Sequence, residues 1–283
     1  MNLEDIGGII VPLITPVDEK EKIDEAKLRF MVNRVVDGGV NGILVFGSNG
    51  EFYMFDEKEH ERGLKAVIDE NGGRVPVYYG IGSIGTAQGV REAKMAASAG
   101  ADGISVLQTM FIKPTEQGMY RHFRTIAEAV PDTYVLLYNN PGRCGYGLTA
   151  DLVEKLARDV KNIVGIKDSS GNFTLVSELI RRTRDIGFKV FTGKDTMVFG
   201  GLCMGSSGAR EDQFRLNPVR LSQDAASFPV ATKDMANMIG LDVGNPVLPS
   251  EPSEGEVLEK MRRCIEEADL FQEDSVPSAE KQG

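Results

Sequence analysis

The stretch VVDGGVNGILVFG, residues 35–47, contains the repeating unit from which the fold is predicted. An amphipathic segment ends at Gly39, and an apolar run rich in β-branched residues starts within a few residues. The same punctuation returns in SAGADGISVLQT, residues 98–109, where the helical segment ends at Gly100. Short apolar strands that alternate with amphipathic helices predict parallel strands with the helices on the outside.

Strand-like runs recur along most of the chain, separated by stretches with apolar residues at helical spacing. They lie at residues 7–15, 40–47, 75–82, 102–109, 133–139, 162–168, 188–193 and, less clearly, 203–209. About eight units of roughly 30 residues each fit a (β/α)8 (TIM) barrel better than an open sheet.

The end of the chain departs from this repeat. A long amphipathic helix should follow the eighth run, but the sequence there is polar and uneven, so we expect the eighth barrel helix to be atypical or missing. We expect a barrel domain at residues 1–218, a short helical C-terminal segment at 219–272 and a disordered tail at 273–283.

The bulk composition narrows the classes of function. The chain has 283 residues, 41% of them hydrophobic, which is enough for one large core. Its net charge of −10 argues against nucleic acid or an anionic membrane as the main partner. The sequence has no apolar run of transmembrane length and no basic leader, so we expect a cytoplasmic protein. The cysteines are few and odd in number, which suggests reduced thiols; they are Cys144, Cys203 and Cys264. The two histidines, His60 and His122, are isolated from possible partner residues and argue against a metal site or a Ser-His-Asp triad.

Lys167 ends the strand-like run NIVGIKD, residues 162–168. In a barrel of this kind the active site lies at the carboxyl ends of the strands. Neighbouring side chains dehydrate a lysine in this position and disfavour its ammonium form. The free amine can condense with a carbonyl compound to give a Schiff base, which serves as an electron sink. The alternative is a lysine that reaches water or pairs with Asp168.

Two polar residues belong to the end of the preceding run, TYVLLYN at residues 133–139. Tyr138 closes this run, and we expect its phenol to open onto the same mouth as Lys167 and to transfer protons there. Arg143 stands in a Pro/Gly turn, from which its guanidinium can meet a carboxylate. The alternatives are a core tyrosine with a satisfied hydroxyl and a solvated loop arginine.

A glycine-containing loop, FGSNGEF, follows the second run. Its glycines, among them Gly47, let the backbone come close to a ligand, while Ser48 and Asn49 offer hydrogen-bond donors. Such a loop suits the carboxylate of a 2-oxo acid, and the alternative is an ordinary turn, for which Asn-Gly is a routine signal. Ser207 finishes the eighth run, and we include it among the substrate-binding candidates.

The stretch GIGSIG, residues 80–85, formally matches a dinucleotide-binding fingerprint. A Rossmann domain would place this motif after its first strand and an acidic residue at the end of the next strand. Here the next run finishes near Gln108. We therefore disfavour nucleotide binding, and a nicotinamide-dependent dehydrogenase is the weakest alternative.

Taken together, the motifs resemble the N-acetylneuraminate lyase and dihydrodipicolinate synthase family of class I aldolases. The resemblance covers residues 8–209. It depends on GSNGE at 47–51, KPTEQG at 113–118, YNNPGR at 138–143 and GIKDSSG at 165–171, and the segment MIGLDVGNPVLP at 238–249 is also similar.

The resemblance implies a tetrameric barrel that reversibly joins pyruvate, or another 2-oxo acid, to an aldehyde. It implies that Lys167 forms the Schiff base, with no further cofactor, and that Tyr138 is the general acid and base. By the same resemblance, Ser48 and Asn49 would hold the carboxylate of the oxo acid, and Arg143 would meet the polar end of the second substrate.

Three features depart from the pattern of the family. Asn49 replaces a hydroxyl residue of the family loop, and the loop is closer to that of members that cleave 4-hydroxy-2-oxo acids. Dihydrodipicolinate synthases use a tyrosine of a neighbouring subunit in a proton relay, and Phe111 in the corresponding stretch MFIKPT cannot relay protons. Relatives also carry additional residues where this chain passes directly from LNPVRLSQ to FPVATKDMA.

The sequence therefore favours a Schiff-base lyase and leaves two main alternatives. One is 4-hydroxy-tetrahydrodipicolinate synthase, which joins pyruvate to aspartate semialdehyde and which Phe111 disfavours. The other is a non-catalytic protein that binds a 2-oxo acid, because the altered stretch at residues 210–229 can loosen the barrel and misplace its mouth.

Overall fold

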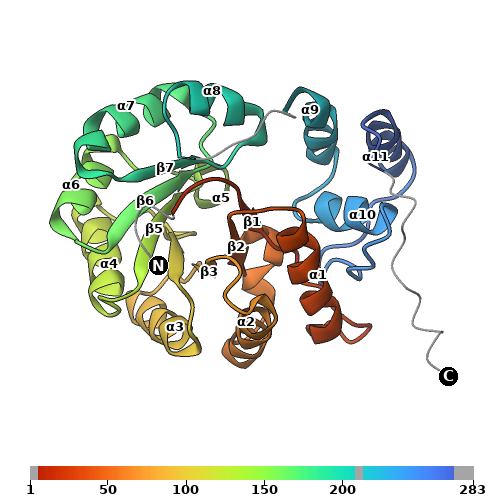
Figure 1. The fold of residues 1–283 in the computed structure, drawn as a ribbon, viewed down its shortest axis with the longest axis horizontal. Coiled ribbons are helices and arrows are strands. Elements are labelled where there is room, and N and C mark those ends of the chain that lie inside the picture. Colours follow the sequence, from red (N-terminus) through yellow and green to blue (C-terminus); the bar gives the residue numbers. More distant parts are fainter. Residues whose placement is uncertain (1–5, 208–212, 271–283) are drawn as a thin grey trace.

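The computed structural model describes residues 6–207 and 213–270, and it confirms the predicted barrel architecture. Seven parallel strands pair in sequence order in one curved sheet, and helices cover its outer face (Figure 1). The strands are β1 (Ile10–Pro12), β2 (Gly42–Val45), β3 (Val77–Ile81), β4 (Gly103–Leu107), β5 (Tyr134–Asn139), β6 (Ile163–Asp168) and β7 (Lys189–Thr192).

The helices begin where the sequence offers capping side chains. Asp24, Asp56, Thr115, Thr149 and Asn172 each accept a hydrogen bond from an amide in the first turn of a helix. The helices around the sheet are α1 (Glu25–Asp37), α2 (Glu57–Asn71), α3 (Thr86–Ala99), α4 (Glu116–Glu128), α5 (Pro141–Cys144), α6 (Ala150–Asp159), α7 (Phe173–Thr183) and α8 (Val198–Cys203). Further along the chain lie α9 (Gln213–Ser222), α10 (Val230–Met238) and α11 (Glu256–Glu267).

Both faces of the sheet are buried. Successive side chains of a strand point to opposite faces, so each strand contributes to two apolar layers. One apolar layer joins the outer face to the surrounding helices. The other fills the inside of the sheet and consists of Ile6, Leu44, Tyr78, Leu136, Val164 and Phe191. The interior is therefore a packed core, and a binding site must lie at an end of the barrel.

The expected eighth strand at residues 203–209 is not formed, and this prediction was wrong for the described part of that run. Cys203 is the last residue of α8, and among the described residues of this run Ser207 bonds to the strand on one side and to the chain before β1 on the other. The Ser207 amide donates to the Val190 carbonyl of β7 at 2.9 Å, and the Ser207 carbonyl accepts from the Gly8 amide at 2.8 Å. Glycine and serine dominate this run, and they lack the β-branched and aromatic side chains that favour strands.

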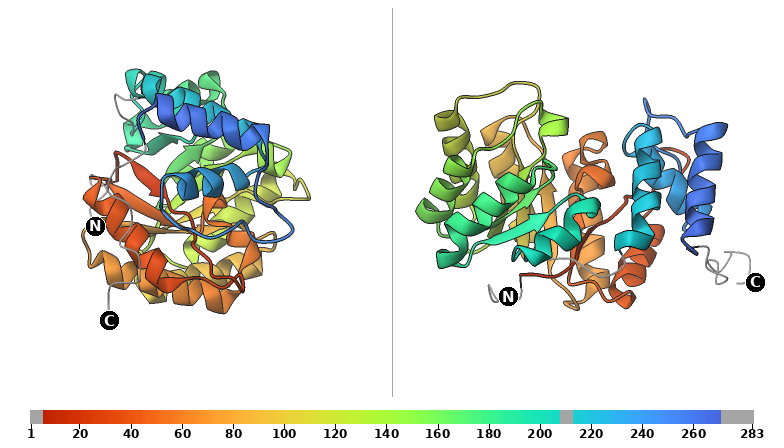
Figure 2. Two further views of the ribbon diagram at one scale, coloured as in Figure 1. Left: turned by 90° about the vertical axis from the view of Figure 1, so that its right-hand side faces the viewer. Right: turned by 90° about the horizontal axis from the view of Figure 1, so that it is seen from above.

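The atypical eighth helix is confirmed. The helix α9 contains Pro218 and packs against η5 (Asp195–Met197) and α11. Figure 2 shows that α9, α10 and α11 form a group beside the barrel. The division expected between residues 218 and 219 falls within α9 and stays a prediction, and the expected tail at 273–283 lies outside the described residues.

The C-terminal group also contacts the barrel. Ala236 of α10 and Val243 form a small apolar cluster with Ile14, just after β1, and Met31 of α1. The helices α10 and α11 share a second cluster of their own. Within residues 6–207 and 213–270, no helix has both the length and the apolar character needed to cross a membrane.

The closure through Ser207 predicts a difference between two substitutions. Ser207→Pro removes the amide that donates to Val190 and leaves that carbonyl without its donor, which costs about 1–3 kcal/mol in the free energy of unfolding. Ser207→Ala keeps both backbone bonds, and we expect it to change stability by less than about 0.5 kcal/mol. Urea unfolding of both variants tests this; equal stability of the two would contradict closure through the Ser207 backbone.

Candidate active site

Lys167 and Tyr138 lie next to each other across the β5–β6 ladder. The two residues are partners in its register, so their side chains point to the same, inner face of the sheet. The Lys167 ammonium nitrogen lies 4.9 Å from the centroid of the Tyr138 ring. The strand ends thus bring together the two side chains that the sequence predicted to share one mouth.

Asp168 turns away from this pair. Its Oδ1 accepts from the Asn139 side-chain amide at 2.6 Å, and its Oδ2 accepts from the Ser170 hydroxyl at 2.6 Å. Burial raises the pKa of Asp168, and the hydrogen bonds from Ser170 and Asn139 oppose that rise. The carboxylate therefore ties the outer side of β6 to β5, and the alternative of a Lys167–Asp168 pair does not match the geometry.

The Tyr138 hydroxyl is part of a hydrogen-bonded group. It accepts from the Asn140 side-chain amide at 2.9 Å, and it also bonds to the hydroxyls of Ser48 and Ser169. Burial acts to raise the pKa of this phenol. The Lys167 cation and the three hydrogen bonds outweigh burial, so the pKa of Tyr138 lies below its ordinary value.

The loop after β2 places Ser48 opposite Tyr138. It forms a short 3-10 turn, η2 (Ser48–Gly50), followed by Glu51 in the left-handed backbone region at φ 52°. The Thr15 hydroxyl donates to the Gly50 carbonyl at 2.8 Å, and a Cβ on Gly50 would lie 3.0 Å from the Leu13 carbonyl. A side chain at this position would crowd the Leu13 carbonyl, so the glycine favours this close approach of the loop to the end of β1.

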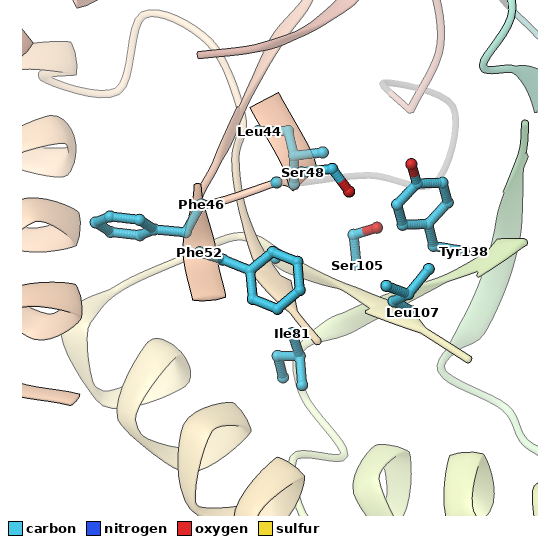
Figure 3. Close-up of a pocket in the computed structure, with 10 residues that line it drawn as sticks. Leu44, Phe46, Ser48, Phe52, Ile81, Ser105, Leu107 and Tyr138 are labelled. Atoms are coloured by element: carbon cyan, nitrogen blue, oxygen red, sulfur yellow. The ribbon is translucent and has the colours of Figure 1, made fainter. Parts of the chain in front are cut away.

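A pocket opens at this end of the barrel, between the loop and β5 (Figure 3). Most of its lining is apolar, and its polar side chains are the hydroxyl groups of Ser48, Ser105 and Tyr138. The complete lining is Leu44, Phe46, Gly47, Ser48, Phe52, Gly80, Ile81, Ser105, Leu107 and Tyr138.

A buried ion pair attaches the same loop to the C-terminal segment. Glu51 Oε2 lies 2.6 Å from the Lys233 nitrogen of α10, and both side chains are fully buried. Lys233 also donates to the Asn245 carbonyl at 3.0 Å, and Glu51 Oε1 accepts from the Val247 amide at 3.1 Å. Burial lowers the pKa of Lys233, and the Glu51 carboxylate offsets part of that shift.

The other predicted site residues have different surroundings. Asn49 is half-buried in η2, next to Ser48. The exposed Arg143 lies in α5 with its guanidinium carbon 4.1 Å from the ring centroid of Phe228, in the connection between α9 and α10. Ser207 is not among the residues that line the pocket, and its backbone contacts are to β7 and to the residues before β1.

Sequence reasoning missed two residues of the site. Lys233 gave no signal, because its contact with Glu51 depends on the path of the C-terminal segment. Ser105 gave a weak signal, since a serine interrupts the apolar run of β4 at an inward position. The histidines are buried: His60 bonds to the Tyr79 hydroxyl and the Phe52 carbonyl, and His122 bonds to a threonine.

The described residues also bear on metal binding. Among residues 6–207 and 213–270, no three His, Cys, Asp or Glu side chains are grouped so that they could hold a metal ion. The expectation that the reaction needs no metal stays a prediction from the sequence.

A lysine on a barrel strand, beside a phenol at the carboxyl ends of the strands, is the arrangement expected of a class I aldolase-type lyase. The sequence profile of the dihydrodipicolinate synthetase family matches residues 5–225. The chain belongs to this family, and the resemblance found in its motifs is confirmed.

Two relatives and two solved structures illustrate the similarity. The 4-hydroxy-tetrahydrodipicolinate synthase of Methanospirillum hungatei is 31% identical to this chain, and the alignment covers 93% of this chain and 99% of the relative. The 4-hydroxy-tetrahydrodipicolinate synthase of Thermus thermophilus is 33% identical, and the alignment covers 93% of this chain and 97% of the relative. The dihydrodipicolinate synthase of Aquifex aeolicus superposes with a TM-score of 0.90 at 28% identity, over 95% of this chain and 100% of that one. The dihydrodipicolinate synthase of Bacillus anthracis superposes with a TM-score of 0.87 at 30% sequence identity, over 92% of this chain and 97% of that one.

The Glu51–Lys233 pair predicts a large, non-additive effect on stability. Lys233→Met leaves the Glu51 carboxylate buried without its charged partner, and we expect the free energy of unfolding to fall by about 3–5 kcal/mol. The double variant Glu51→Gln/Lys233→Met carries no uncompensated charge and should recover part of that loss. Urea unfolding measures both; additive losses in the double-mutant cycle would show that the pair is not coupled.

The surroundings of Tyr138 predict its titration. The pKa of Tyr138 should lie below the ordinary tyrosine value of about 10, because the Lys167 cation stabilises the phenolate. Lys167→Met removes this cation while burial remains, so the pKa of Tyr138 should rise. Tyrosinate absorbance against pH measures the shift, and Tyr138→Phe identifies the signal.

Lys155→Met is the matched control for this titration. Lys155 lies 4.7 Å from the ring centroid of Tyr120, a comparable lysine–tyrosine contact outside the pocket. It should leave the pKa of Tyr138 unchanged. An unaltered pKa of Tyr138 in Lys167→Met would contradict the electrostatic coupling of Lys167 to Tyr138.

Proposed function

We propose that this protein reversibly joins pyruvate, or a related 2-oxo acid, to an aldehyde through a Schiff base on Lys167. One observation carries the proposal: the Lys167 nitrogen lies over the Tyr138 ring at the mouth of the barrel, while the neighbouring Asp168 is bound elsewhere. The lowered pKa of Tyr138 favours its phenolate, and a phenolate next to the amine can take a proton from it.

The proposed reaction follows from these two groups. The phenolate of Tyr138 accepts a proton from the Lys167 ammonium group, and the free amine adds to C2 of the oxo acid. Tyr138 returns that proton to the hydroxyl group on C2, which leaves as water, so that a protonated imine remains. The phenolate then takes a proton from C3, and the electron pair of that C–H bond moves towards the cationic nitrogen to form an enamine. C3 then attacks the carbonyl carbon of the aldehyde, whose oxygen takes a proton from Tyr138, and hydrolysis of the imine releases the 4-hydroxy-2-oxo acid.

Other residues are assigned supporting roles in this proposal. Ser48 and Asn49, in the turn that begins after Gly47, hold the carboxylate of the oxo acid. Arg143 meets the polar end of the second substrate, and the contact with the Phe228 ring would help to orient its guanidinium. We keep Ser207, whose backbone bonds to Val190 of β7 and to Gly8, as a candidate substrate contact.

The second candidate function is 4-hydroxy-tetrahydrodipicolinate synthase, because the relatives described above carry that name. Phe111 argues against it, since a phenyl ring cannot take part in a proton relay. The Phe111 side chain is 92% exposed and its backbone is held at φ 69°, so it is presented to the outside of this subunit.

We also propose a homo-oligomer, by family resemblance a tetramer. Phe111 and Ile112 are neighbouring exposed apolar side chains on one loop. Phe173 of α7 and Leu202 of α8 are also exposed. Apolar groups of this kind are typical of contacts between subunits.

The three cysteines are unpaired, which agrees with a reducing, cytoplasmic location.

A cleavage assay tests the proposed function. The protein is incubated with a set of 4-hydroxy-2-oxo acids and sugar acids, and released pyruvate is detected with a coupled dehydrogenase. We expect release from at least one member and no release by Lys167→Met. Tyr138→Phe should lower kcat by about 10²–10⁴, because it removes the proton-transfer group.

Tyr134→Phe is the matched control, because it removes a phenol from the opposite end of the same strand. It should leave kcat unchanged. Pyruvate binding in calorimetry without release from any substrate would instead favour a binding protein. Turnover of pyruvate with aspartate semialdehyde at a rate above all cleavage reactions would favour the synthase.

A further inference from the structure

Ser105 is a buried hydroxyl group on the floor of the pocket. It lies in the middle of β4, opposite Gly80 of β3, and is 4% exposed. Its side chain points into the pocket on the same side as Ser48 and Tyr138 (Figure 3). Among the described residues, no group accepts a hydrogen bond from the Ser105 hydroxyl or donates one to it.

The other two hydroxyl groups of the pocket already have partners. Ser48 and Tyr138 bond to each other, and Tyr138 also accepts from Asn140. The remaining lining consists of glycines, which have no side-chain donor, and of apolar side chains such as Leu44 and Leu107. Among the residues that line this pocket, Ser105 therefore carries a buried side-chain hydroxyl without a hydrogen-bond partner.

An unpartnered hydroxyl in an apolar cavity is unfavourable unless a ligand satisfies it. A carboxylate is the group that gains most from an additional donor, because hydrogen bonds to a charged oxygen are stronger than those between neutral groups. We propose that Ser105 donates a hydrogen bond to a carboxylate oxygen of the bound 2-oxo acid and so helps to select that class of substrate. This inference rests on the proposed function of the site.

Calorimetric titration tests the role of Ser105, with pyruvate and its neutral amide, pyruvamide, as probes. Ser105→Ala should raise the dissociation constant for pyruvate at least about tenfold, the usual loss for a hydrogen bond to a charged group. It should weaken pyruvamide binding less, because a hydrogen bond to a neutral oxygen contributes less than one to a carboxylate. The melting temperature of the free protein should stay the same or rise, because the substitution removes a buried group that has no partner.

Ser83→Ala is the matched control. Ser83 is also buried with an unpartnered hydroxyl, but it is not among the residues that line the pocket. It should leave the dissociation constant for pyruvate unchanged.

Three results would overturn the inference: equal pyruvate affinity of Ser105→Ala and the wild type, an equal loss for both probes, or no binding of pyruvate by the wild type. Calorimetry reports binding whether or not a covalent adduct follows. A failure of the Schiff-base chemistry in the cleavage assay is therefore distinguishable from a failure of the Ser105 contact.

Discussion

The register between β5 and β6 is the constraint on which the proposed chemistry depends. The ladder pairs Val135 with Ile163, but the next pair joins Leu136 to Gly165, so β6 contains a bulge at Val164. This extra residue brings Lys167 opposite Tyr138; an unbroken ladder would place Ile166 there. Bulges are common beside active sites because they re-aim side chains.

Contacts on the other side of the strands hold this register. Asn139 and Asp168, the next partners in the ladder, bond to each other on the outer face. Gln108, just after β4, donates from its side-chain amide to Asn139 Oδ1 at 3.2 Å. Its side-chain oxygen Oε1 accepts from the backbone amide of Asn140 at 2.9 Å. A buried amide and carboxylate network thus fixes three strand ends, so the inward pair is placed by groups that do not face the pocket.

The C-terminal segment has a comparable effect on the substrate loop. Lys233 and the Val247 amide both bond to Glu51, which directly follows the turn that carries Ser48. The chain has an irregular eighth unit, and this fully buried pair connects its C-terminal helices to the mouth of the barrel. A change in the position of α10 would therefore be transmitted to the loop.

Much of this arrangement followed from local sequence patterns. Seven strands, the positions of Lys167 and Tyr138 at the ends of neighbouring strands, and the loop at Ser48 could be predicted because each depends on residues close together in the chain. The register that brings Lys167 opposite Tyr138 depends on the bulge. The closure through Ser207, the bulge at Val164 and the Glu51–Lys233 pair could not. They depend on which backbone groups meet across the barrel, and neither periodicity nor turn signals carry that information.

The most direct test of the account is reduction of the protein with borohydride in the presence of pyruvate, followed by peptide mapping. The account predicts one reduced pyruvate adduct, located on Lys167, and none on the buried Lys233. An adduct on another lysine, or none at pyruvate concentrations that saturate the pocket, would contradict it.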